Sequence, residues 1–356
     1  MIESGKFSDK RILLIDKEQK IKNDRTWCFW EKENGLFESI VYKRWDHLWF
    51  HTDDYSRLLT INPYQYKLIK GIDFYKFCFD KIRQHHNIDL IYGNVTTIHS
   101  GITEASLTIN NTNYAAPFVF NSILFNKPRL GENEYYLLQH FKGWVIETEI
   151  DLFNPNEAVL MDFRPSQRNG TSFVYVMPYT KRKALVEYTL FSSSLLDSKE
   201  YDLGLEEYIP HQLKIARYKV IEEEFGIIPM TNYRFPQRSE RIINIGTAGG
   251  QTKGSSGYTF QFIQKHSAAI VNKLVKDEIP VVNISPRRFN FYDSILLNIL
   301  HYKTLQGKTI LSDIFRKNKP QTVLRFLDNE SSFTEDLKII SSLPVLPFLK
   351  AALKQI

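Results

Sequence analysis

Glu187 is the residue whose type and surroundings point most directly to acid–base chemistry. It lies in the middle of the apolar run ALVEYTLF, residues 184–191. If this run is a strand, Glu187 shares a face with Leu185, Thr189 and Phe191. A carboxylate on such a face is costly unless it is paired or protonated, and burial raises its pKa, which suits a general acid. A structural ion pair or a place at a sheet edge is the commoner explanation for one acidic residue in a strand.

Asp162, in the run VLMDF, is a weaker candidate of the same kind. His85 and His86 are adjacent and have no partners at ligand spacing, so we expect no metal site. The sequence contains no G-x-S-x-G motif and no Cys/His motif in a recognisable context. Any acid–base chemistry is therefore expected to depend on carboxyl groups.

A glycine-rich stretch is the clearest candidate for a cofactor site. It follows the strand-like run RIINIG, precedes a long helical pattern, and contains Thr247 together with Gly246, Gly249, Gly250, Gly254 and Gly257. Glycine lets the backbone approach a ligand closely, and a helix N-terminus favours negative charge. A cofactor pyrophosphate or the pyrimidine edge of a flavin would suit this loop. The stretch is not a P-loop, because Gly254 and not Ser or Thr follows Lys253. An ordinary flexible loop is the alternative.

Asp16 ends the short apolar run RILLID, residues 11–16, which predicts a buried parallel strand. In dinucleotide-binding folds, an acidic residue at such a strand end binds the ribose hydroxyls. The G-x-G-x-x-G loop that normally precedes this strand does not occur in the chain. A helix cap or a solvated turn is the alternative role for Asp16.

The order of predicted elements indicates an α/β fold with an inserted β-sheet. A helix at 73–87, with Asp73 as its N-cap, is followed by a strand at 88–97, which is typical of a parallel α/β unit. Four strand-like runs between 141 and 191 predict a mainly antiparallel sheet, and a helix is expected at 205–224. We therefore expect a discontinuous dinucleotide-binding domain (1–130 and 237–284), an inserted β-sheet substrate domain (131–236) and a helical C-terminal region (285–356).

Composition limits the functions to be considered. The net charge is +6, but lysines and arginines are scattered and do not form a patch with interleaved aromatics, so we expect no nucleic-acid partner. Two cysteines without a CxxC motif favour a reducing cytoplasm. No run of apolar residues is long enough to cross a bilayer. The C-terminal stretch LPVLPFLKAALKQI carries apolar faces flanked by Lys350 and Lys354, which suits either a membrane surface or packing on the domain.

Eight stretches in order along the chain resemble bacterial lycopene β-cyclases, a branch of the flavoprotein monooxygenase-like superfamily. They are NDRTWCFW (23–30), YQYKLIKGIDFY (64–75), LLQHFKGWVIET (137–148), FVYVMPYT (173–180), ALVEYT (184–189), FGIIPM (225–230), IGTAGGQTKGSSGYTF (245–260) and RFNFYDSILLNIL (288–300). The resemblance covers essentially the whole chain. It implies an FAD/NAD(P)-binding Rossmann-like domain, and it identifies ALVEYT with the acidic strand motif that the family needs for activity.

The resemblance also implies a reaction. In this family an acid protonates a terminal double bond of lycopene, a carbocation closes the ring, and loss of a ring proton leaves a β-ionone ring, without net redox change. Reduced FAD, maintained by NAD(P)H, is thought to stabilise the cation. Glu187 is then the expected proton donor or the residue that positions it, with Asp162 as a second candidate and Arg25 in NDRTWCFW as a cofactor contact. The expected location is the cytoplasm, peripheral at the inner face of the membrane.

Family members begin with a strand and a G-x-G-x-x-G loop that would precede Met1. We therefore expect that the start codon of this sequence is wrongly assigned, and that the chain without this loop binds flavin weakly. Two rival functions remain. One is a hydroxylase or geranylgeranyl-type reductase of the same superfamily, which depends on a Gly-Asp pair where this chain has Gly246-Thr247. The other is an apolar-ligand carrier without flavin.

Overall fold

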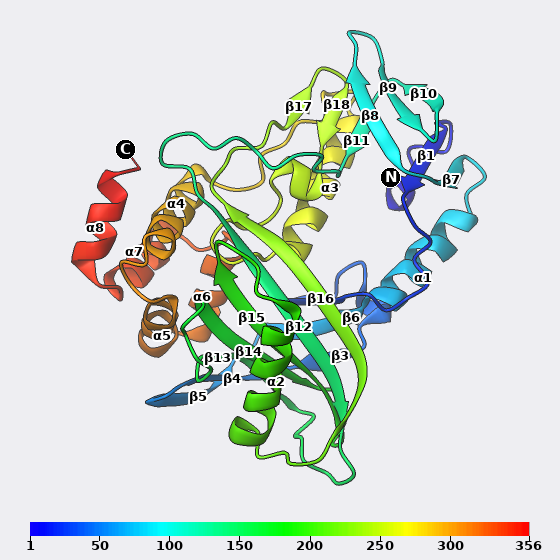
Figure 1. Cartoon of the computed structure of the whole chain (residues 1–356). Helices are drawn as coiled ribbons and strands as arrows, with labels where there is room; N and C mark the ends of the chain where they lie inside the picture. The colour runs from blue at the N-terminus through cyan, green and yellow to red at the C-terminus, as the bar shows by residue number, and fades with distance from the viewer. Residues whose placement is uncertain (356) are drawn as a thin grey trace.

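The computed structural model describes residues 1–355, and a seven-stranded sheet forms its centre (Figure 1). Its neighbouring strands are antiparallel except β13 and β4, which are parallel. In spatial order the strands are β16 (Lys219–Thr231), β12 (Tyr136–Glu147), β15 (Lys183–Ser192), β14 (Thr171–Pro178), β13 (Glu157–Asp162), β4 (His47–Thr52) and β5 (Tyr55–Thr60). The predicted antiparallel sheet between 141 and 191 is confirmed, and the strands at 47–60, which the sequence placed in the dinucleotide-binding domain, extend it.

Short parallel pairs lie beside this sheet. β1 (Ile12–Asp16) pairs with β7 (Ile88–Tyr92), and β11 (Val119–Asn121) pairs with β18 (Ile242–Asn244). Residues 119–121 and 242–244 thus lie side by side although most of the large sheet separates them in sequence. The other strands outside the large sheet include β17 (Arg238–Ser239), which pairs with β18, and the β8–β9–β10 meander (Val95–Ser100, Ala105–Ile109, Thr112–Ala116). The helices of the same part of the chain are α1 (Gly71–Arg83) and α3 (Phe260–Val275). The short 3-10 turns are η1 (Ile2–Ser4), η2 (Glu38–Ile40) and η3 (Gly246–Gly249).

A three-stranded sheet that the sequence did not predict packs against both the main core of the large sheet and helix α3. It consists of β2 (Thr26–Glu31), β6 (Gln65–Lys70) and β3 (Lys43–Trp45), all antiparallel. Trp30, Trp45 and Tyr66 of these strands are almost fully buried in the main core. The aromatic residues of this region are therefore largely used to pack one sheet against the other.

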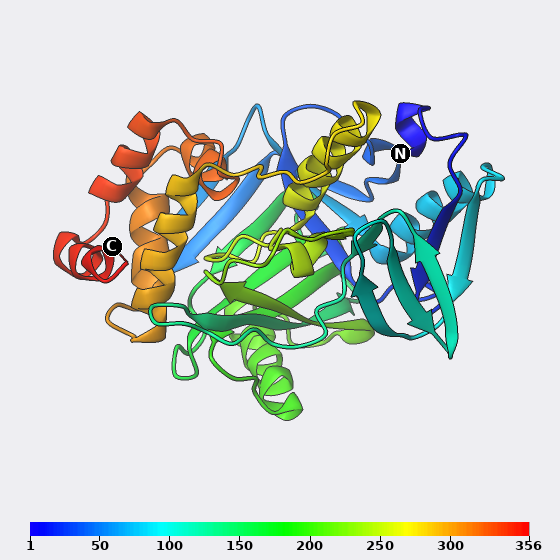
Figure 2. The same ribbon diagram turned by 90° about the horizontal axis from the view of Figure 1, so that it is seen from above.

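Helices cover both faces of the large sheet (Figure 2). On one face, α2 (Ser198–Gln212) buries Tyr201, Leu205 and Ile209 against Trp144 and Val186. On the other, the C-terminal region is helical, as predicted. Its helices are α4 (Arg287–His301), α5 (Gly307–Lys317), α6 (Pro320–Leu327), α7 (Phe333–Ser341) and α8 (Val345–Leu353). Among residues 1–355, no helix combines the length and the apolar character that a bilayer crossing requires.

Several predictions of local structure were wrong. The helix expected at 205–224 ends at Gln212, and residues 219–231 form strand β16, whose Val, Ile and Phe side chains suit a strand despite three consecutive glutamates. β1 is parallel as expected but not buried, since Leu13 and Leu14 are each more than a third exposed beside a single neighbouring strand. The predicted strand 88–97 is divided between β7 and β8, and α1 begins at Gly71, so that Asp73 lies in its first turn and is not its N-cap.

Candidate active site

A cavity of about 390 Å³ lies between the small sheet, the large sheet and the glycine-rich loop. This volume falls within the range of small-molecule sites. β2, β12, β15 and β16 each supply part of its wall. The lining residues are Asp24 to Cys28, Tyr66, Gln139, Phe141, Tyr175, Met177, Glu187, Phe225 to Pro229, Thr247 and Gly257 to Phe260. Glu187, Arg25 and Thr247, which are far apart in sequence, are therefore brought to one cavity.

Glu187 lies on the cavity face of the large sheet. Strand alternation places it on the face opposite Val186 and Tyr188, which pack against α2. Its neighbours across the strands are Gly143 on β12 and Tyr175 on β14. The side chain is buried, and Thr189 Oγ1 donates a hydrogen bond to Glu187 Oε1 at 3.0 Å. Neither a cation nor any other ion-pair partner contacts Glu187 in the part of the chain that the structure describes.

The pKa of Glu187 is raised well above the ordinary value of a glutamate. Burial in the apolar wall is the main cause, and the negative charge of Glu224 adds to it. A group with a raised pKa holds its proton at a pH where an exposed glutamate is ionised. Glu187 thus meets a physical requirement of a general acid, which is a carboxyl group that keeps its proton where an exposed glutamate is ionised.

Glu224 is the functional candidate that the sequence interpretation missed. It lies on β16, opposite Gly143, so that Glu224, Gly143 and Glu187 form one row across three strands. A Cβ atom at Gly143 would lie 2.9 Å from Glu224 Cγ, so only glycine leaves room for the two carboxyl groups there. The prediction of a helix over 205–224 hid this residue. The alternation of Val220, Glu222 and Glu224 with Ile221, Glu223 and Phe225 gives no clear strand signal.

Aromatic side chains form much of the remaining wall. The rings of Trp27 and Phe260 are tilted, with centroids 5.3 Å apart, and Tyr258 packs edge-on against Trp30 outside the wall at 4.7 Å. The aromatic residues that line the cavity are Trp27, Tyr66, Phe141, Tyr175, Phe225, Tyr258 and Phe260. Aromatic faces attract cations, and the attraction is strongest where water is excluded.

The glycine-rich loop borders the cavity through Thr247 and Gly257. Gly246, Gly250 and Gly257 have positive φ angles of 55°, 71° and 71°. A Cβ at Gly257 would lie 2.1 Å from Gln139 Oε1, so the loop backbone itself forms the wall there. Gly249 and Gly254 lie against the backbone carbonyls of Asn244 and Thr231 and outside the cavity wall. The glycines therefore shape the loop, and only part of it faces the cavity.

Lys253 fixes this loop to the helical region. Its side chain is almost fully buried, and Nζ contacts Asp293 Oδ1 of α4 at 2.8 Å and Asn329 Oδ1 at 2.7 Å. Ser255 Oγ donates to the same Asp293 oxygen at 2.6 Å. Lys253 is thus used in a structural ion pair, which agrees with the absence of a P-loop motif.

Asp16 and Arg25 occupy different positions relative to the cavity. Arg25 contributes to its wall and pairs with Asp24, Nη2 to Oδ2, at 2.8 Å. Asp16 lies outside the wall, where its Oδ1 accepts from the Glu18 backbone N–H at 3.1 Å and lies 3.3 Å from Lys20 Nζ. The turn contacts of Asp16 correspond to the alternative role considered from the sequence.

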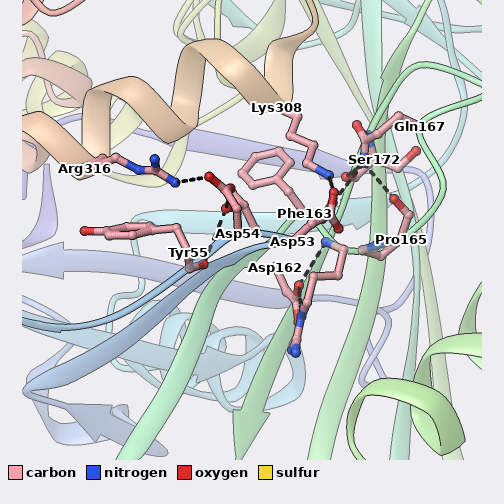
Figure 3. Close-up of polar contacts among 12 residues, drawn as sticks. Asp53, Asp54, Tyr55, Asp162, Phe163, Pro165, Gln167, Ser172, Lys308 and Arg316 are labelled. Atoms are coloured by element: carbon pink, nitrogen blue, oxygen red, sulfur yellow. Dashed lines mark hydrogen bonds and ion pairs between the residues drawn. The ribbon is translucent and has the colours of Figure 1, made fainter.

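Asp162 is not brought to the cavity. It is fully buried on the α2 face, where Tyr208 donates to Oδ2 at 2.6 Å and Arg164 Nε donates to Oδ1 at 2.8 Å. Nearby, Lys308 and Arg316 of α5 pair with Asp53 and Asp54 at the β4–β5 turn (Figure 3). Asp162 thus has a complete set of partners and belongs to a structural region.

Comparison with known proteins then places the chain. The family model described as lycopene cyclase protein matches residues 5–353. The chain belongs to the lycopene cyclase family. None of the curated protein sequences matches this lycopene cyclase family member.

The fold of this family member is shared with flavoproteins of low sequence identity. A geranylgeranyl bacteriochlorophyll reductase-like protein from Thermoplasma acidophilum aligns over 100% of this chain and 96% of its own, with a TM-score of 0.62 and 15% identity. A flavoprotein/dehydrogenase from Cytophaga hutchinsonii aligns over 92% and 88%, with a TM-score of 0.59 and 11% identity. HpxO from Klebsiella pneumoniae, solved with FAD and uric acid, aligns over 90% of both chains, with a TM-score of 0.58 and 10% identity. The predicted α/β flavoprotein fold is thus confirmed.

The anchoring of the glycine-rich loop can be tested with Lys253→Met. This change leaves Asp293 buried without its cation, which should lower the free energy of unfolding by about 3–5 kcal/mol. Urea denaturation measures the loss. Lys265→Met is the matched control, because the Lys265–Glu330 pair is partly exposed and should contribute less than about 1 kcal/mol. Equal effects of the two changes would contradict the anchoring role.

Proposed function

We propose that this protein is a lycopene β-cyclase, which converts the open ends of lycopene to β-ionone rings, giving β-carotene through γ-carotene. The observation that carries the proposal is a buried glutamate, with no cation beside it among the described residues, in the wall of a cavity that is also lined by seven aromatic residues. The match to the lycopene cyclase family supports the substrate class. Acid-initiated cyclisation needs a protonated donor, which the glutamate would provide, and surroundings in which a carbocation survives, which the aromatic residues would provide.

Glu187 is the proposed proton donor. Its O–H bond breaks as a C–H bond forms at the terminal double bond of the substrate, which leaves a tertiary carbocation. The neighbouring double bond attacks that cation and closes the ring. Loss of a ring proton then restores a double bond, so one proton enters, one leaves, and no electrons are exchanged with another molecule. Thr189, which donates to Glu187 Oε1, orients the carboxyl group in the wall.

The aromatic wall is the proposed stabiliser of the cation. Rings of Trp27, Tyr175 and Tyr258 line the same cavity as Glu187. Each ring face that meets the cation in a dry site contributes about 1–2 kcal/mol. The same rings keep out water, which would otherwise trap the carbocation as an alcohol.

The cavity wall also fits a flavin. Gln139 Oε1 and Trp27 Nε1 are buried in the wall and have no hydrogen-bond partner among residues 1–355, which leaves an acceptor and a donor for a bound ring system. The turn at Gly246 to Gly250 and the backbone at Gly257 would hold the flavin, with Arg25 near its polar groups. Bound FAD in its reduced form, maintained by NAD(P)H, supplies electron density that favours cationic charge in the substrate.

A reductase of the same superfamily is the second candidate, since one structural neighbour is described as geranylgeranyl reductase-like. Gly246 is followed by Thr247 in place of the aspartate of those enzymes, which favours the cyclase. Product mass separates the two reactions, because cyclisation conserves the mass of lycopene whereas reduction adds two hydrogens per double bond.

The C-terminal apolar surface is the proposed site of membrane association at the cytoplasmic face. We give this name to Phe333 and Leu337 of α7 and Val345, Leu346, Leu349 and Leu353 of α8, each at least half exposed. Both helices lie at one end of the molecule (Figure 1). Lys338, Lys350 and Lys354 accompany them and would face anionic headgroups. A substrate as apolar as lycopene resides in lipid, so the enzyme must reach it there.

Replacement of the donor is the direct test of the reaction. In a lycopene-accumulating host, we expect the protein to form β-ringed carotenoid that chromatography detects. Glu187→Gln should lower product formation at least about 100-fold, because an amide cannot donate the proton. Glu206→Gln, an exposed change on α2, is the control. Heavier or oxygenated products, or full activity of Glu187→Gln, would exclude this mechanism.

Gly257→Ala tests the flavin site. The added methyl group would collide with Gln139 and sit on a residue with φ of 71°, so the Gln139 side chain, the loop backbone or both must shift at this wall. We expect the flavin retained after purification, read from its visible absorption, to fall at least about tenfold. Gly5→Ala also has positive φ but open space around it, and it should retain flavin. Equal flavin content in both variants would place the cofactor elsewhere.

Leu346→Glu combined with Leu349→Glu tests the C-terminal apolar surface. Removing two apolar contacts should weaken sedimentation with phosphatidylcholine–phosphatidylglycerol vesicles at least about tenfold. Ile102→Glu is the control, since Ile102 is 84% exposed on a distant hairpin. If Ile102→Glu weakens binding as much as the double variant, the C-terminal apolar surface is not the membrane site.

A further inference from the structure

Glu224 holds a position that the proposed reaction does not yet use. It faces Glu187 across Gly143, and its side chain is nine-tenths buried. The other glutamates of the same strand are exposed and have polar partners, with Glu222 accepting from Asn23 and Glu223 pairing with Lys142. Two carboxyl groups are thus buried side by side, although each one alone is costly to bury.

Each carboxyl group of the pair accepts one hydrogen bond from a threonine hydroxyl, and the two bonds differ in length. Thr26 Oγ1 donates to Glu224 Oε2 at 2.7 Å, which stabilises the ionised form of Glu224. Glu224 Oε1 is buried and has no partner in the described residues. Two ionised carboxylates buried in neighbouring positions of one sheet repel each other, so the pair holds one proton, as in other paired carboxyl groups. Thr189 Oγ1 donates the corresponding bond to Glu187 Oε1 at 3.0 Å. The shorter bond from Thr26 favours the charge on Glu224 and therefore the proton on Glu187.

We propose that Glu224 is a positioning residue that carries the negative charge of this pair and so keeps the catalytic proton on Glu187. The proposal rests on the proposed cyclase function. Glu224 is outside the cavity wall whereas Glu187 is part of it, so Glu224 acts through Glu187 and not on the substrate.

The other titratable groups near the pair do not replace this role. Asp24 and Glu222 add negative charge near Glu224. Cys28, Tyr66, Tyr175 and Tyr258 face Glu187, and burial raises the pKa of each, so they stay neutral. Tyr179, close to Glu224, is neutral for the same reason. Arg25 lines the same cavity, but its charge is paired with Asp24.

The proton balance of the reaction is consistent with such a pair. When Glu187 gives its proton to the substrate, both carboxylates are briefly ionised beside a carbocation, whose positive charge offsets their repulsion. The ring proton that is lost afterwards returns to Glu187, the carboxylate in the cavity wall. The pair then again holds one proton, ready for the next ring.

The test is the pH dependence of cyclisation by the full chain, measured with lycopene in phosphatidylcholine vesicles and chemically reduced FAD. Because protonated Glu187 is the active form, activity is lost as pH rises through its raised pKa. Glu224→Gln removes the charge that raises this pKa, so the loss of activity should move to lower pH by about one to two units. Thr26→Val should move it in the same direction by less, and Glu224→Asp, which keeps the charge, should restore the wild-type profile.

Glu223→Gln is the matched control, because Glu223 pairs with Lys142 on the other face of the same strand and should leave the profile unchanged. If Glu224→Gln does not fold, Thr26→Val decides alone. The proposal is overturned if the pH profiles of Glu224→Gln and Thr26→Val coincide with that of the wild type, or if their activity is lowered by the same factor at every pH. Either outcome leaves the cyclase function intact. A wild-type chain that forms no β-rings overturns the proposed function itself.

Discussion

The cost of burying a carboxyl group away from water governs the candidate site. An ionised carboxylate inside an apolar wall must be paired, neutralised or hydrogen-bonded. Asp162 is paired with Arg164 and Tyr208, whereas Glu187 meets another carboxyl group and no cation. The two acidic residues lie on opposite faces of one sheet, and this difference in partners separates a structural role from a chemical one.

The sheet can hold this arrangement because its neighbours leave room for it. Gly143 carries no side chain between the two glutamates, and a Cβ at Gly226 would lie 2.2 Å from the ring of Phe141, which occupies that space in the cavity wall. The glycine-rich loop forms the opposite wall, and the buried ion pair of Lys253 and Asp293 connects it to the C-terminal helices. A loop that is rich in glycine and still fixed at one end suits a cofactor site, since it combines close backbone approach with a defined position.

Hydrophobic periodicity and the placement of glycines predicted the elements that depend mainly on short stretches of sequence. The antiparallel strands around Glu187, the strand–loop–helix at Gly246 and the helical C-terminal region all follow from periodicity and glycine placement. Strand β16 was missed because its glutamates favour a helix locally, and only pairing with β12 makes it a strand. The pairing of Glu224 with Glu187 depends on the same long-range register, so the sequence identified the proposed proton donor and not its partner. β1 fits a buried strand by composition, yet its burial depends on neighbours that a six-residue run does not specify.

Because the fold is shared with proteins described as a reductase and a dehydrogenase, the fold alone does not choose the reaction. Redox chemistry at a flavin does not require a protonated carboxyl group in the wall, and a buried acid without a cation would be an unnecessary cost for it. Acid-initiated cyclisation requires such a group and requires that water be excluded. The row of Glu187, Gly143 and Glu224 is therefore the feature of this chain that an electron-transfer function leaves unexplained and a cyclase function uses.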